Sequence, residues 1–282
     1  MAGIKVVADS ACDLDSSLVE EHGIEIVPLD VRLGEWGPDA LNLISAAEFW
    51  RRCATTDALP ETSAPSPGAF AESFSQAAHD GYSSIVCLTL SAGLSGTYQA
   101  AVAGAEEVRG RVDVRVVDTR TVSVGEAMVV LEAARVAAAT NDVELAEAAA
   151  RAVVPNIHVY CTFDTLDFVR KGGRIGAAKA YLGSLLSIKP VVEIRDGVVR
   201  GESRQRTRVR SLEYLVDLVK RAGKLDALSV AHAAAADLDV FLDMLAGVFP
   251  REDTLVNYLG PVIGTHGGPG CVGVAFLPAG TA

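Results

Sequence analysis

Residues 91–98, Ser-Ala-Gly-Leu-Ser-Gly-Thr-Tyr, combine hydroxyl side chains and glycines in one short segment. The apolar run before it, residues 85–90, predicts a buried strand, and residues 98–108 after it predict a helix. A turn of this composition places free backbone N–H groups at the positive end of a helix, where they can bind an anion such as a carboxylate. Ser95 and Gly96 are therefore the first candidate ligand-binding residues.

A second group of hydroxyl side chains, Thr62, Ser63 and Ser66, comes directly before Pro67. In one interpretation Ser66 caps a helix that begins at Pro67, and the other two are ordinary turn residues. In the other, Thr62 and Ser63 lie beside the Ser95 turn and help to hold a carboxylate by hydroxyl and backbone donors. Such an uncharged site neutralises the head group only modestly, so the bound acid could be handed on. The residues themselves leave both interpretations open.

Ser95 also permits a hydrolase interpretation. A nucleophile elbow requires Gly-x-Ser-x-Gly, and residues 93–97 read Gly-Leu-Ser-Gly-Thr, so the final glycine is missing. His266, far downstream, could act as the base. It lies in Thr-His-Gly-Gly-Pro-Gly, residues 265–270, which predicts either a tight loop approached closely by another segment or a simple turn. A Ser-His lipid or ester hydrolase that uses Ser95 and His266 is the alternative function.

The chain lacks sequence signals for the common cofactors. Residues 268–273 match Gly-x-Gly-x-x-Gly, but a strand-like run follows instead of a helix, so a dinucleotide site is rejected. No Walker A motif, His-Glu-x-x-His or metal-spaced cluster is present. We expect no cofactor, and neither ATP binding nor water activation by a metal on this chain.

Basic residues concentrate in one part of an acidic chain, whose net charge of −11 argues against general affinity for nucleic acid or anionic membranes. Lys171-Gly-Gly-Arg174 joins two predicted helices, where a glycine C-cap followed by cations is an ordinary helix end. A denser stretch comprises Arg195, Arg200, Arg204, Arg206, Arg208 and Arg210. It is equally consistent with a solvated hairpin edge and with a docking face for an acidic partner or a phosphate.

Strand and helix signals alternate through the first half of the chain. The predicted strands are residues 4–8, 24–28, 85–90 and 112–117, and helices are predicted around 18–21, 67–80, 98–108, 123–139 and 143–154. The helix at 123 is expected to begin with a capping box, Ser123-x-x-Glu126. This alternation predicts an α/β fold with an N-terminal, mostly parallel sheet and flanking helices.

The second half predicts an α+β domain. Its expected strands are residues 158–162, 189–195, 198–202, 228–231 and 272–277, and its expected helices are 165–171, 177–186, 212–222 and 238–248. Asp196-Gly197 predicts a hairpin turn. We divide the chain into an N-terminal domain, residues 1–153, and a C-terminal domain, residues 154–282.

The cysteines and the apolar runs suggest a compartment. The five cysteines are widely spaced and include no Cys-x-x-Cys pair, which favours reduced thiols in a cytoplasmic protein. The apolar run at the N-terminus is too short for a signal peptide, and no stretch of about 18 apolar residues predicts a membrane span.

Several of these segments occur together, in this order, in a known family. They are Asp-Ser-Ala-Cys-Asp-Leu (9–14), Thr-Ser-Ala-Pro-Ser (62–66), Leu-Ser-Gly-Thr-Tyr (94–98), Lys-Gly-Gly-Arg-Ile (171–175), Ile-Lys-Pro (188–190), Arg-Thr (206–207) and His-Gly-Gly-Pro-Gly (266–270). The chain resembles the DegV family over essentially its whole length. That family includes the fatty-acid-binding subunits of bacterial fatty acid kinase. The chain departs from the family at Ala64, where glutamine is frequent, and at Ala11 and Cys12.

The resemblance implies a lipid carrier with its ligand at the interdomain region. A fatty acid such as palmitate, stearate or oleate would lie buried, its carboxylate bonded to Thr62 and Ser95, with His266 and Arg174 in the surrounding polar network. Arg206 would help to engage a dihydroxyacetone-kinase-like fatty acid kinase subunit, which phosphorylates the acid to an acyl phosphate with ATP. The resemblance would also allow transient contact with a membrane. A regulatory module that senses another small carboxylate is a third, weaker alternative.

Overall fold

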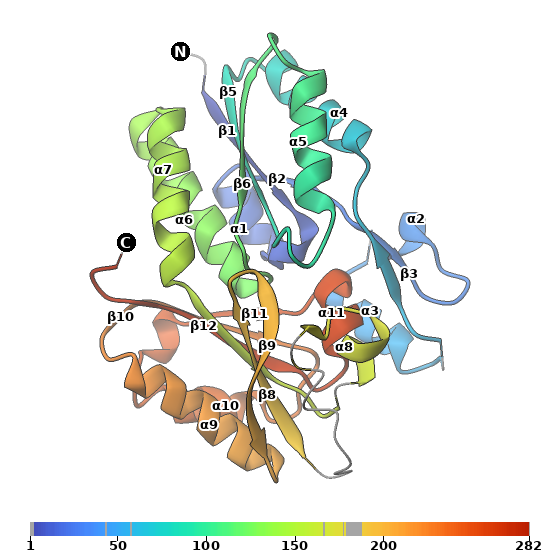
Figure 1. Ribbon diagram of the computed structural model, residues 1–282, viewed down its shortest axis with the longest axis vertical. Coiled ribbons are helices and arrows are strands. Elements are labelled where there is room, and N and C mark those ends of the chain that lie inside the picture. Colours follow the sequence, from blue (N-terminus) through green and yellow to red (C-terminus); the bar gives the residue numbers. More distant parts are fainter. Residues whose placement is uncertain are drawn as a thin grey trace.

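The computed structural model describes residues 3–42, 44–56, 58–165, 167–176, 178 and 188–281. The first half forms a parallel sheet of four strands in the order β2-β1-β5-β6 (Figure 1). Its strands are β1 (Ile4–Asp9), β2 (Glu25–Val27), β5 (Ser84–Thr89) and β6 (Asp113–Asp118). Helices α1 (Ser16–Glu21), α4 (Pro67–His79) and α5 (Thr97–Glu107) lie between these strands in the chain, and α6 (Val124–Thr140) and α7 (Val143–Val153) follow β6. The predicted α/β fold with a parallel N-terminal sheet is confirmed.

Helices cover both faces of this sheet (Figure 1). On one face, Val7 and Ile85 pack with Phe70 of α4 and Ala101 of α5. On the other, alternate strand residues such as Val6 and Leu88 pack against α6 and α7. Because neighbouring residues of a strand point to opposite faces, the continuous apolar runs in β1 and β5 are what a sheet buried on both sides requires.

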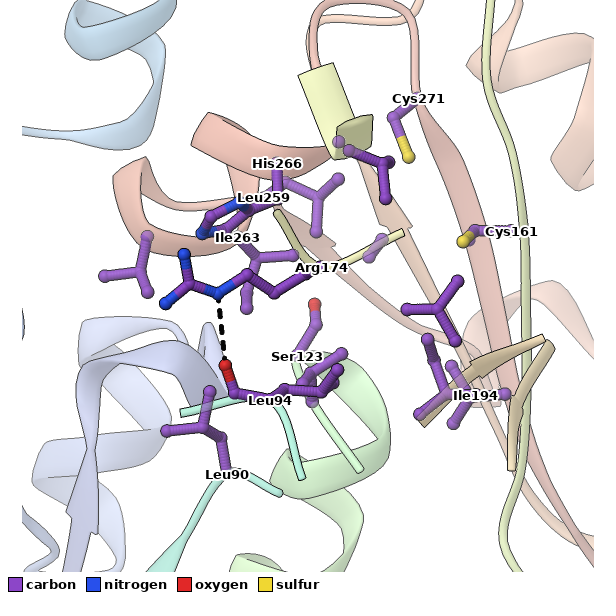
Figure 2. A pocket seen from close by; sticks show the side chains of 18 of the residues that line it. Leu90, Leu94, Ser123, Cys161, Arg174, Ile194, Leu259, Ile263, His266 and Cys271 are labelled. Atoms are coloured by element: carbon purple, nitrogen blue, oxygen red, sulfur yellow. Dashed lines mark hydrogen bonds between the residues drawn. The ribbon is translucent and has the colours of Figure 1, made fainter. Parts of the chain in front are cut away.

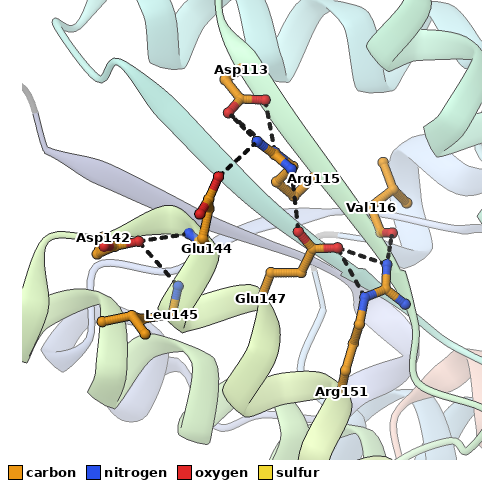
Figure 3. Close-up of polar contacts among 8 residues, drawn as sticks. All are labelled: Asp113, Arg115, Val116, Asp142, Glu144, Leu145, Glu147 and Arg151. Atoms are coloured by element: carbon orange, nitrogen blue, oxygen red, sulfur yellow. Dashed lines mark hydrogen bonds and ion pairs between the residues drawn. The ribbon is translucent and has the colours of Figure 1, made fainter.

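Ion pairs hold α7 beside the edge strand β6 (Figure 3). Arg115 of β6 donates to Asp113 at 2.9 Å and lies 3.7 Å from Glu147 of α7. Arg151 bonds Glu147 at 2.9 Å and the carbonyl of Val116 at 3.2 Å. Exposed pairs of this kind contribute little stability, about 0–1 kcal/mol each. Their charges also make the edge strand a poor template for pairing with another chain.

The second half forms a mixed sheet of six strands in the order β11-β10-β12-β7-β8-β9. The strands are β7 (His158–Thr162), β8 (Lys189–Arg195), β9 (Val198–Gln205), β10 (Leu225–His232), β11 (Leu255–Tyr258) and β12 (Val272–Pro278). Helices α9 (Arg208–Arg221) and α10 (Leu238–Leu245) cover its outer face. The inner face, which includes Val159 and Ile194, packs with Val124 and Met128 of α6 in the first half.

Short elements that the sequence did not indicate surround this junction. They are β3 (Asp30–Arg32), α2 (Pro38–Leu41), α3 (Ala46–Cys53), β4 (Glu61–Ser63) and α11 (Pro261–Gly267). The helix predicted at 165–171 is also present, as α8 (Asp167–Lys171). Trp50 of α3 donates its indole N–H to the carbonyl of Leu259 at 2.9 Å. An added Cβ on Gly264 of α11 would collide with that indole at 2.6 Å. Early and late segments of the chain therefore meet in close contact.

Two local predictions are wrong. Ser123 precedes α6, but its side chain caps no backbone group, and the carboxylate oxygens of Glu126 are buried without a hydrogen-bond partner, so no capping box forms. His266 lies in the last turn of α11 instead of a loop. The helix predicted at 177–186 falls almost wholly outside the described residues. The division at residue 153 remains a prediction, although α7 ends there.

Candidate functional site: an apolar cavity with a polar mouth

A cavity lies between the inner face of the second sheet and the first half of the molecule (Figure 2). Its empty space, including the open mouth, is about 900 Å³. Most of its lining is aliphatic or aromatic. That part comprises Leu29, Leu90, Leu94, Val122, Val124, Val159, Phe163, Val169, Val192, Ile194, Val199, Ala231, Leu259, Val262 and Ile263, together with Gly267 and Gly273. Such a surface suits a hydrocarbon chain.

The polar side chains of the lining come from distant parts of the sequence. They are Thr62, Ser95, Ser123, Arg174 and His266, besides the thiols of Cys161 and Cys271. Thr62, Arg174 and His266 also line a hollow on the other side, together with Glu61 and Lys171. These three shared residues therefore form the boundary between the apolar cavity and the hollow outside it. In Figure 2, Arg174 and His266 lie together, while Cys161 and Ile194 lie on the other side of the cavity.

Thr62 and His266 are paired across this boundary. Thr62 is the middle residue of β4, opposite Val31 of β3, and its Oγ1 lies 3.1 Å from Nε2 of His266. Burial is the main cause that lowers the pKa of His266 to about 4, and the nearby Arg174 cation lowers it further. The imidazole is therefore neutral near pH 7. It can exchange a hydrogen bond with Thr62 or a ligand without forming an ion pair.

The Ser95 turn presents hydroxyls at the start of α5. Ser95 Oγ lies 2.8 Å from Thr97 Oγ1, and it accepts the Thr97 N–H at 3.3 Å. Gly96 is the N-cap of α5 and has no side chain to satisfy the first backbone N–H groups. The positive end of an 11-residue helix thus lies next to a cavity-lining hydroxyl.

Two glycines bring Arg174 and His266 into place. Gly173 has a φ of +73°, in the left-handed region that favours glycine, and it turns the chain after α8. An added Cβ on Gly172 would collide with Nδ1 of His266, so only glycine allows this approach. Arg174 then donates from Nε to the carbonyl of Leu94 at 3.2 Å, beside Ser95 (Figure 2). Segments from both halves of the chain thus meet at the mouth.

Four of the candidate residues, Thr62, Ser95, Arg174 and His266, share this cavity. Ser63 and Gly96 are exposed neighbours that do not line it, and Ser63 alternates with Thr62 along β4. Arg206 lies between β9 and α9, exposed, and within the described residues its guanidinium has no hydrogen bond or ion pair. The other arginines of that stretch have partners, for example Arg208 with Asp237 at 2.8 Å.

The apolar lining of the cavity and the presence of Ser123 in it were not predicted from the sequence. One signal was available: Val159 and Cys161 alternate along the predicted strand at 158–162, so they must share one face. The Ser95–His266 pair of a hydrolase does not form, because Ser95 bonds Thr97 and His266 bonds Thr62. Among the described residues, no group of three or more His, Cys, Asp or Glu could hold a metal ion. No helix in the same residues has the length and apolarity to cross a membrane.

Comparisons with known proteins agree over the whole chain. A family model described as an uncharacterised protein of the DegV family matches residues 3–279. A DegV domain-containing protein from Streptomyces coelicolor is 38% identical over 279 residues, which cover 96% of this chain and 97% of that protein.

Solved structures give the same result. A DegV family protein from Thermus thermophilus, described by its fatty acid binding, has a TM-score of 0.87 and 32% identity, over 98% of this chain and 99% of that one. DegV from Bacillus subtilis, described as a fatty acid binding protein, has a TM-score of 0.85 and 26% identity, with the same coverage. Both of these neighbours are thus described as binding fatty acids. This chain belongs to the DegV family.

Proposed function

We propose that this protein binds one long-chain fatty acid in the apolar cavity and presents its carboxylate to a partner kinase for conversion to an acyl phosphate. The observation that carries the proposal is the shape of the site: an apolar cavity whose boundary with an outer hollow is made by Thr62, Arg174 and His266. The fatty acid binding of the Thermus thermophilus and Bacillus subtilis relatives supports it.

The lining explains the affinity expected for a lipid. Each methylene removed from water contributes about 0.8 kcal/mol, so a long acyl chain offsets the cost of immobilising it. At the mouth, Thr62 and Ser95 supply hydroxyl donors to the carboxylate, and Gly96 adds the N-terminal end of α5. Because His266 is neutral near pH 7 and Arg174 is exposed, the head group is not locked into a buried ion pair. It stays nucleophilic, as an acceptor of a phosphoryl group must be.

A separate chain is proposed to supply the phosphoryl transfer, since this sequence lacks a nucleotide-binding motif. The exposed guanidinium of Arg206 is the proposed contact for that partner. Reconstitution tests the proposal: the purified chain, loaded with oleate, is mixed with ATP and a bacterial dihydroxyacetone-kinase-like fatty acid kinase, and acyl phosphate is trapped with hydroxylamine. We expect a hydroxamate only when both proteins are present. If oleate is bound but no hydroxamate forms, the kinase step is wrong and the binding step stands.

A further inference from the structure

Ser123 has a backbone conformation that residues other than glycine rarely adopt. Its φ is 53° and its ψ is −134°, at the residue directly before α6. Such backbone strain is held in place by its surroundings and concentrates at functional sites. The residue is buried, and it lines the acyl cavity. In Figure 2 its hydroxyl points from the start of the green helix into the space that the labelled side chains enclose.

The turn around Ser123 shares part of the nucleophile-elbow pattern Gly-x-Ser-x-Gly. Residues 121–125 read Thr-Val-Ser-Val-Gly, so the glycine two residues after the serine is present and Thr121 stands in place of the first one. An added Cβ on Gly125 would lie 2.5 Å from Thr121 Oγ1 and 2.5 Å from Val159 Cγ2. The two ends of the pentapeptide are therefore in contact, and this contact requires a glycine at position 125. In such a turn the N–H of the next residue, here Val124, supplies one oxyanion donor.

Ser123 also has a carboxylate partner in position to act as a base. Its Oγ donates to Oδ2 of Asp13 at 2.6 Å. Both residues are fixed by the backbone: Oδ1 of Asp13 accepts the Gly260 N–H at 2.9 Å, and the Ser123 N–H donates to the carbonyl of Ala11 at 2.9 Å. Glu126, Cys12 and Asp9 are the titratable neighbours.

The acid–base property of Asp13 agrees with this geometry. Burial raises its pKa to about 7, although its hydrogen bonds from Ser123 and Gly260 act in the opposite direction. A general base is most effective when its pKa is close to the working pH. A carboxylate with an ordinary pKa near 4 would be a much weaker acceptor for a serine proton.

We propose that Ser123 and Asp13 form a nucleophile–base pair that hydrolyses carboxylic esters whose acyl chain occupies the cavity. Ser123 Oγ bonds to the carbonyl carbon while its proton passes to Asp13 Oδ2. The carbon–oxygen bond to the alcohol breaks, and that oxygen takes the proton from Asp13. Water then attacks the acyl-serine, gives a proton to Asp13, and releases the acid as Ser123 recovers its proton.

This activity would extend the proposed function by producing the ligand in the cavity that holds it. The inference uses the acyl cavity of the proposed function but does not depend on the kinase partner. It also differs from a hydrolase built on Ser95 and His266, because those side chains bond Thr97 and Thr62 instead of each other.

A serine-directed fluorophosphonate tests the pair on the purified full-length chain. The protein is labelled with and without added oleate, and the modified peptide is identified by mass spectrometry. We expect the phosphonate on Ser123, protection by oleate, and no label in Ser123→Ala. Ser73 is the internal control, because its hydroxyl also bonds a carboxylate, Glu25, at 2.5 Å but does not line the cavity. It should stay unlabelled, and Ser73→Ala should label like the parent chain.

Asp13→Asn should slow labelling about 100-fold or more, the usual contribution of a general base. In the parent chain, the labelling rate and the hydrolysis of 4-nitrophenyl decanoate should rise with pH through about 7, as Asp13 loses its proton. An absence of label on the parent chain, or label on another residue, overturns the proposal whatever the variants do. Oleate retention is read by native mass spectrometry on the same samples, so the failure of lipid binding is seen separately.

Discussion

Replacing Thr62 with valine removes one hydroxyl from the mouth of the cavity and leaves the apolar lining intact. Its Oγ1, 3.1 Å from His266 Nε2, is proposed to donate to the ligand's carboxylate. A hydrogen bond to a charged group contributes about 1.5–3 kcal/mol, so fatty-acid affinity should fall about 10- to 150-fold. Ser95→Ala should have an effect of similar size.

The assay is calorimetric titration of the delipidated chain with saturated acids of increasing length. In the parent chain the binding free energy should become more favourable by about 0.8 kcal/mol per methylene. Thr62→Val should shift this line by a constant amount and leave its slope unchanged, because the lining is untouched. Thr55→Val is the matched control, since Thr55 is exposed and its hydroxyl donates to the carbonyl of Arg52 at 2.8 Å. A changed slope without an offset, or no change at all, would refute the placement of the carboxylate at Thr62.

Three further predictions concern the mouth and the docking surface. Gly172→Ala should push the His266 ring away and weaken lipid retention, which is read by native mass spectrometry. Gly37→Ala is the control, because its Cβ would meet nothing within 4 Å. Equal lipid retention by the two variants would argue against the packing of Gly172 on His266. His266 has a pKa of about 4 in the folded chain, against an ordinary value of 6.5. Between these two pH values the folded chain binds fewer protons than the unfolded chain, so its stability falls as the pH drops from 6.5 to 4. Urea titrations should show a weaker acid dependence in His266→Gln, and identical pH profiles would contradict the assignment. Arg206→Ala should reduce hydroxamate formation with the kinase and spare oleate binding. Arg210→Ala is the control and should act like the parent chain, because the guanidinium of Arg210 is paired with Glu213 at 2.9 Å. Equal hydroxamate formation by the two variants would remove Arg206 from the docking surface.

The parallel sheet could be predicted because its strands carry their own signal. The apolar runs in β1 and β5 are buried on both faces, so local composition and tertiary environment agree. The strand β4 gave no such signal: Glu61-Thr62-Ser63 is polar throughout and is a strand only because it pairs with β3. The helix α11 is short and rich in glycine, and its contact with Trp50 stabilises it.

The mouth of the cavity was only partly predictable for the same reason. Thr62 and His266 are 204 residues apart, and no local pattern indicates that they meet. The family resemblance suggested these residues, and the structure shows the bond between them. Ser123 illustrates the opposite case. Its Ser-x-x-Glu spacing suits a helix cap, but the partner that it bonds is Asp13, 110 residues earlier in the chain.

Fatty acid binding is best tested by native mass spectrometry of the purified chain, followed by extraction and identification of any bound small molecule. We expect one fatty acid per chain, or uptake of one added oleate by a chain purified without lipid. A chain that carries no lipid and takes up neither palmitate nor oleate would contradict the carrier function, although the family and the fold would stand.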